Sequence, residues 1–120
     1  MKHILTVDDS RVMRDMLKMT LTNAGFDVTQ AVDGEHGIEV AKARIPDAII
    51  TDINMPKLDG FGFIEAIRKD DRFRAVPILV LTTEASPEKK NRAKNAGATG
   101  WIIKPFDDAK LVSALSRVLA

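Results

Sequence analysis

The chain has 120 residues, of which 45% are hydrophobic and 29% charged, and its 18 basic and 17 acidic residues leave a formal net charge of +1. This length fits one domain, and the near balance of charge gives no sign of a nucleic-acid or membrane surface. The absence of cysteine excludes a disulfide scaffold, thiol catalysis and cysteine zinc sites, while the lack of a long apolar run or a signal peptide makes the cytoplasm the expected compartment.

Five short segments have the length of β-strands. Four of them are continuous apolar runs rich in β-branched residues, which is typical of strands buried on both faces of a parallel sheet. The segment 26–31 instead alternates apolar and polar side chains, so we expect it at an edge of the sheet. In chain order the segments are 4–7, 26–31, 48–51, 78–81 and 101–103.

A helix-length segment follows each of these strands. The first, residues 12–24, has apolar side chains at helical spacing, and we expect Met13, Met16 and Met19 to pack against the rest of the protein. Each of the other four segments begins after a side chain that can cap a helix. These four caps are Asp33, Asp59, Ser86 and Asp107.

The strict alternation of five strands and five helices predicts an α/β fold. In such a fold a doubly wound parallel sheet carries helices on both faces and has right-handed crossovers. No repeat, low-complexity tract or linker interrupts residues 1–120, so we expect one domain. The alternation alone does not determine the order of the strands.

Carboxylates directly follow two of the predicted strands: Asp8 and Asp9 follow the first, and Asp52 follows the third. Ligands of open parallel sheets bind at the carboxyl ends of the strands, where the strand order reverses. In the order 2-1-3-4-5 the three acids would converge there, and two charges about 4 Å apart repel by about 4 kcal/mol at an effective dielectric of 20. A hard divalent cation such as Mg²⁺ would offset this repulsion. Alternatively, Asp8 and Asp9 only cap the next helix.

Two other predicted strands end on polar side chains. Thr82 closes the fourth strand and Lys104 closes the fifth. Each residue taken alone is more often simply exposed to solvent. A hydroxyl and an ammonium group at the same edge as the acids, however, suit a phosphoryl group, whose negative charge must be held.

Together these residues resemble the receiver domain of two-component response regulators, and the similarity covers the whole chain. Its most specific parts are DINMP at 52–56 with DG at 59–60, and KPF at 104–106. We expect no effector domain to follow, so the chain resembles most the stand-alone chemotaxis regulators. The resemblance implies the flavodoxin-like strand order 2-1-3-4-5 and a monomeric signalling protein rather than an enzyme.

The resemblance also implies the role of each acid. Asp52 is expected to accept a phosphoryl group from a histidine of a partner kinase, or from small donors without a kinase. Mg²⁺ would be held by Asp9, Asp52 and the backbone carbonyl of Asn54, with Asp8 acting through a water molecule. Asn54 and Glu84 flank the approach of the hydrolysing water and are expected to tune its rate.

Three further positions correspond to the conformational switch of the family. Lys104 would pair with a phosphoryl oxygen, its peptide bond to Pro105 being cis, and Thr82 would move inward to bind another phosphoryl oxygen. Trp101 stands where the family usually has an aromatic residue that changes rotamer. The expected output surface lies near the fourth helix, and its basic residues suit an acidic partner segment. Its members are Lys89, Lys90, Arg92, Lys94 and Trp101.

The target that this surface binds is left open by the sequence. A flagellar motor switch protein is the expected partner, and a phosphatase is a possible second one. The alternatives are a phosphate sink or a relay that passes the phosphoryl group to a second histidine. A Mg²⁺-dependent phosphatase with an aspartyl nucleophile is a distant alternative. Phosphatases of that class resemble one another in a D-x-D pattern after the first strand, whereas Asp8 and Asp9 are adjacent here.

Overall fold

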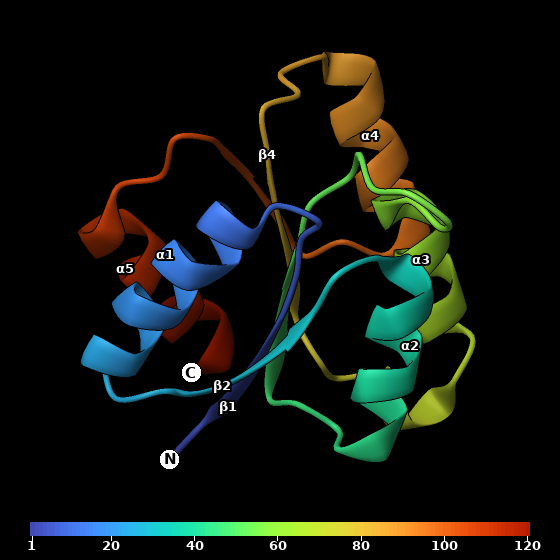
Figure 1. Cartoon of the computed structure of the whole chain (residues 1–120). Coiled ribbons are helices and arrows are strands. Elements are labelled where there is room, and N and C mark those ends of the chain that lie inside the picture. Colours follow the sequence, from blue (N-terminus) through green and yellow to red (C-terminus); the bar gives the residue numbers. More distant parts are fainter.

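The computed structural model describes all 120 residues and contains one sheet of five parallel strands (Figure 1). The sheet order is β2-β1-β3-β4-β5, so the predicted doubly wound fold and its strand order are confirmed. No helix is long and apolar enough to cross a membrane. The strands are β1 (His3–Val7), β2 (Asp27–Ala31), β3 (Ala48–Thr51), β4 (Ile78–Thr82) and β5 (Gly100–Ile103).

Five α-helices alternate with the strands, and each begins after a side chain that accepts a backbone N–H of its first turn. Ser10 caps the first helix, so neither Asp8 nor Asp9 does. A single 3₁₀ turn, η1 (Asp71–Phe73), was not predicted. The helices are α1 (Arg11–Asn23), α2 (Gly34–Ala43), α3 (Gly60–Arg68), α4 (Pro87–Ala96) and α5 (Asp108–Leu119).

The helices form two layers around the sheet (Figure 1). Helices α1 and α5 cover one face, and α2, α3 and α4 cover the other. Each face has its own buried cluster: Leu17, Leu21 and Leu115 belong to the cluster under α1 and α5, and Phe63 and Ile64 to the larger one under α2 to α4. Helix α4 contributes only Ala93 to the buried core.

Two packing expectations were wrong. Strand β5 is not buried on both faces, because it lies at the edge of the sheet with a neighbouring strand on one side only. Its first three residues are half-buried, and Ile103 at its end is exposed. On α1, Met13 packs against the core, but Met16 and Met19 are 47% and 66% exposed because they lie on the outer side of the helix.

His3 is a buried polar side chain at the amino end of β1. Its Nε2 lies 2.8 Å from Thr29 Oγ1, while its Nδ1 is buried without a hydrogen-bond partner. Burial lowers the pKa of His3, and the charge of Arg44 lowers it further, against the opposing charges of Asp27 and Asp47. A second ring proton would place an unpaired N–H donor inside the protein, so the folded state binds that proton poorly.

The lowered pKa of His3 predicts a loss of stability in acid. Below the ordinary value of 6.5 the unfolded chain takes up the proton and the folded chain resists it, so the free energy of unfolding falls with pH. As the pH falls from 7.5 to 5.5, we expect the free energy of unfolding to decrease more for the parent than for His3→Gln, which has no imidazole to titrate. Urea unfolding of both proteins at each pH measures this difference, and parallel pH profiles would contradict the prediction.

Candidate functional site

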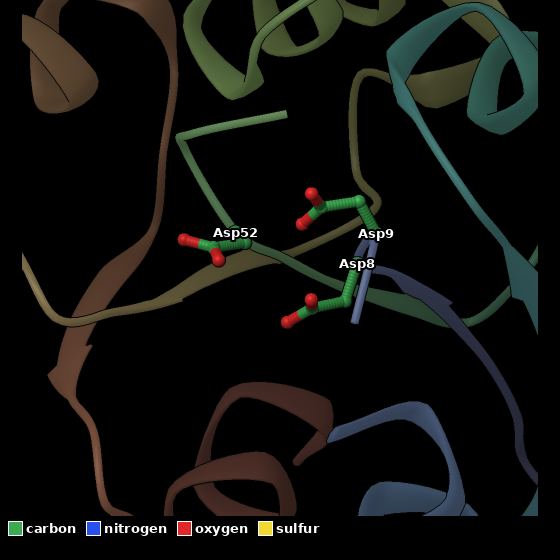
Figure 2. A group of neighbouring side chains, drawn as sticks. All are labelled: Asp8, Asp9 and Asp52. Carbon is green, nitrogen blue, oxygen red and sulfur yellow. The ribbon is translucent and has the colours of Figure 1, made fainter. Parts of the chain in front are cut away.

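The carboxyl ends of four strands bring the candidate residues to one edge of the sheet. Asp8 and Asp9 follow β1 and Asp52 follows β3, while Thr82 ends β4 and Lys104 follows β5. Because all strands are parallel, these positions share the same rim although they are far apart in the sequence. Figure 2 shows the three carboxyl groups side by side at the ends of β1 and β3.

The three acids are close enough to share one metal ion. One oxygen from each of Asp8, Asp9 and Asp52 lies within 4.8 Å of the others. Their exposure is graded: Asp8 is buried, Asp52 is half-buried and Asp9 is exposed. The cluster is therefore open to solvent on one side and closed on the other.

Lys104 is the cation that bridges this cluster. Its Nζ donates to Asp8 Oδ2 at 2.9 Å and to Asp52 Oδ2 at 2.8 Å. The side chains of Lys104, Asp8 and Asp52 are only 11%, 3% and 12% exposed, so water screens these ion pairs weakly.

Burial and hydrogen bonding shift the pKa values of Asp8 and Lys104 in opposite directions. Burial is the largest influence on Asp8 and raises its pKa, against the N–H of Ser10 and the Lys104 ammonium. Burial alone would lower the pKa of Lys104, but its hydrogen bonds to Asp52 and Asp8 and their charges together raise it. Lys104 therefore stays charged near neutral pH and holds the two carboxylates together.

The remaining charge at the site suits a divalent cation. Three carboxylates against one ammonium leave a net charge of about −2 when all are ionised. Asp9 makes no hydrogen bond or ion pair within the protein, and its exposed oxygens are free to bind a ligand. Oxygen donors of this kind are those that hard cations prefer.

The loop after Asp52 is held against the strand end by a glycine. The N–H of Gly60, the first residue of α3, donates to Ile53 O at 2.8 Å. A Cβ at Gly60 would collide with the backbone carbonyl of Asp52. This close approach positions Asp52, whose Oδ1 also accepts the N–H of Ile53.

Neither Thr82, at the end of β4, nor Trp101, within β5, makes a hydrogen bond to the acids. The Thr82 side chain is buried, and its hydroxyl accepts the N–H of Glu84 at 3.3 Å. Trp101 is half-buried and packs against the larger core cluster, opposite Val80 of the neighbouring strand. The Lys104–Pro105 peptide bond is cis.

The basic residues of the expected output surface have different partners. Lys89 pairs with Glu84 at 3.0 Å, and the Arg92 guanidinium lies 4.1 Å from the centroid of the Phe61 ring. Lys90 and Lys94 are exposed. The side chain of Asn54 donates to the same oxygen of Glu84 that Lys89 contacts, and no feature of the sequence predicted this pair of contacts.

The chain matches a protein family model and the sequences and structures of several proteins. The family model described as the response regulator receiver domain matches residues 4–116. Chemotaxis protein CheY1 of Helicobacter pylori is 36% identical over 120 residues, covering 97% of this chain and 95% of that protein. The structure of the chemotaxis response regulator CheY4 of Vibrio cholerae is 46% identical, with a TM-score of 0.93 and 98% coverage of both chains.

A longer relative matches with similar identity. The transcriptional regulator RpaA of Synechocystis is 35% identical over 99% of this chain, but the chain spans only 49% of that protein. Similar domains therefore occur both in short chemotaxis proteins and in longer regulators that bind DNA.

The buried bridge predicts a specific loss of stability. Lys104→Ala leaves Asp8 and Asp52 facing each other without a cation, and we expect the free energy of unfolding to fall by about 3 kcal/mol in metal-free buffer. As a control, Arg74→Ala removes an exposed ion pair with Asp71 and should cost less than about 1 kcal/mol. Urea unfolding of both variants checks this ranking, and equal losses would contradict it.

Proposed function

The chain belongs to the response regulator receiver domain family, whose members are phosphoaccepting signalling proteins, and from this premise we propose that Asp52 is its phosphoacceptor. CheY-like receiver domains take phosphate from histidine kinases, so we infer a phosphohistidine of such a kinase as the donor. The observation that carries the proposal is the acid cluster, in which Lys104 contacts Asp52 at 2.8 Å beside two further carboxylates.

Among the three acids, Asp52 has the environment of a nucleophile. The Asp8 side chain is almost fully buried and is out of reach of a partner protein. Asp9 is exposed but has no contact with Lys104. Only Asp52 combines access from solvent with a neighbouring ammonium, and that charge lowers the repulsion between the carboxylate and an incoming phosphoryl group.

We assign the metal to the same cluster. Asp9, Asp52 and the backbone carbonyl of Asn54 hold Mg²⁺, and Asp8 acts through a water molecule. When bound, Mg²⁺ neutralises charge on the attacking carboxylate and on the phosphoryl oxygens. The net charge of about −2 that Lys104 leaves uncompensated supports this assignment.

Phosphoryl transfer then follows from the placement of these groups. An oxygen of Asp52 attacks phosphorus, the bond from phosphorus to the donor nitrogen breaks, and the imidazole leaves with that electron pair and takes up a proton. In hydrolysis, water attacks phosphorus, the bond to the Asp52 oxygen breaks, and the electron pair returns to the carboxylate. Lys104 donates to a phosphoryl oxygen. Holding the reacting atoms in line accounts for most of the acceleration of phosphoryl transfer.

The output step depends on residues next to the site. The Thr82 hydroxyl turns from the N–H of Glu84 toward the phosphoryl group, and the half-buried Trp101 moves with it. This changes the face around α4 and β5, where exposed Lys90 and Lys94 suit an acidic target segment. The similarity to CheY1 and CheY4 supports the flagellar motor switch as that target, with a phosphate sink or relay as the alternative.

The phosphoacceptor assignment predicts the result of one substitution. Asp52→Asn removes the nucleophilic carboxylate with almost no change of shape, so we expect no phosphoryl adduct with phosphoramidate and Mg²⁺. Intact-protein mass spectrometry at short times measures the adduct. As a control, Asp15→Asn changes an exposed acid on α1 and should keep full uptake. A stable adduct on the Asp52→Asn protein would show that another residue is the acceptor.

The output proposal predicts binding that depends on activation. With Mg²⁺ and beryllofluoride, a mimic of the phosphoryl group, we expect the fluorescence of Trp101, the only tryptophan, to change. A peptide from a flagellar motor switch protein should then bind at least about tenfold more tightly than without beryllofluoride, a coupling of about 1.4 kcal/mol.

The same titration separates the alternatives. Lys104→Ala should weaken the effect of beryllofluoride on peptide binding. Without the ammonium, no side chain at the end of β5 binds the phosphoryl group, so its presence is coupled less strongly to the position of β5. A fluorescence change without peptide binding would favour a sink, a relay or another target.

A further inference from the structure

A side-chain bridge joins the two loops that leave the acid site. Oε1 of Glu84 lies 3.3 Å from the donor Nδ2 of Asn54 and 3.0 Å from Nζ of Lys89. Asn54 belongs to the loop after β3, Glu84 to the loop after β4, and Lys89 to the first turn of α4. One carboxylate oxygen therefore connects three segments of the chain.

The bridge is anchored to the site at both loops. Asn54 is two residues beyond Asp52, and Glu84 is two residues beyond Thr82, whose hydroxyl accepts the N–H of Glu84. The direct contact of the Lys89 ammonium with the carboxylate is the largest influence on the pKa of Glu84 and lowers it, and the hydrogen bond from Asn54 lowers it further. Glu84 is thus held as a carboxylate at a position fixed by partners on either side.

We propose that Lys89 is a positioning residue that prolongs the lifetime of the phosphoryl group by engaging Glu84 in this bridge. The inference rests on the proposed function of Asp52. Water that attacks phosphorus is activated by a neighbouring acceptor. Glu84 Oε1 already accepts a hydrogen bond from Asn54 and forms an ion pair with Lys89 of α4, so it orients that water poorly. Release from Lys89 frees this acceptor and lets it move.

Other basic residues of α4 are not placed to do this. Arg92 lies over the ring of Phe61, on the side of the helix that faces α3, and no ion pair joins Lys90 to a carboxylate. Only Lys89 connects α4 to the residues beside Asp52. Its role therefore differs from that of the exposed lysines that suit a target.

The size of the effect follows from the exposure of the pair. The side chains of Lys89 and Glu84 are 44% and 28% exposed, so water screens their attraction in part. Pairs of this kind shift an equilibrium by a factor of about two to five. We expect Lys89→Ala to speed the loss of the phosphoryl group from Asp52 by this factor.

The experiment loads each protein with phosphoramidate and Mg²⁺, removes the donor, and follows loss of the adduct by mass spectrometry. Lys89→Arg keeps the ion pair and should retain the parent lifetime. Lys42→Ala removes the same charge from an exposed position on α2 and should also leave the lifetime unchanged. Raising the salt concentration should shorten the lifetime of the parent more than that of Lys89→Ala.

A double-mutant cycle tests whether Lys89 acts through Glu84. In a Glu84→Ala background, Lys89→Ala should have no further effect on the lifetime. Equal lifetimes of the parent and Lys89→Ala would overturn the inference while leaving the proposed function intact, and so would an undiminished effect in the Glu84→Ala background. A parent protein that takes up no phosphoryl group would overturn both.

Discussion

The crowding of three carboxylates within 4.8 Å of one another is the constraint on which the rest of the molecule depends. Such a cluster is unfavourable by itself, and Lys104 reaches across from the end of β5 to offset two of the charges. The parallel order β2-β1-β3-β4-β5 makes this possible, because it places the ends of β1 and β3 side by side and the end of β5 on the same rim. The residual negative charge then suits a metal ion and, with it, the phosphoryl group.

Much of this arrangement could be predicted from the sequence, because it depends on signals local to each element. The continuous apolar runs, the capping residues Asp33 and Ser86, and the acids after two strands are each visible without a structure. Alternation of strands and helices left the strand order open. The family resemblance, carried by residues 52–56 and 104–106, supplied it, and the fold bears it out.

The features that could not be predicted depend on neighbours distant in the sequence. A continuous apolar run does not tell a central strand from an edge strand, so the exposure of β5 was missed. The outward orientation of Met16 and Met19 depends on how α1 rests on the sheet. The contacts of Glu84 with Lys89 and Asn54 depend on the geometry of two loops, and a spacing of five residues across a helix start has no characteristic pattern.

Helix α4 buries only Ala93, whereas every other helix buries at least two residues. Little hydrophobic free energy therefore holds α4 against the sheet, and its backbone amides can open without the rest of the core unfolding. Hydrogen exchange in α4 should accordingly be governed by local fluctuation, while β1, β3 and β4 exchange only through global opening. The free energy needed to displace so weakly attached a helix is therefore smaller than that for the helices that bury more side chains.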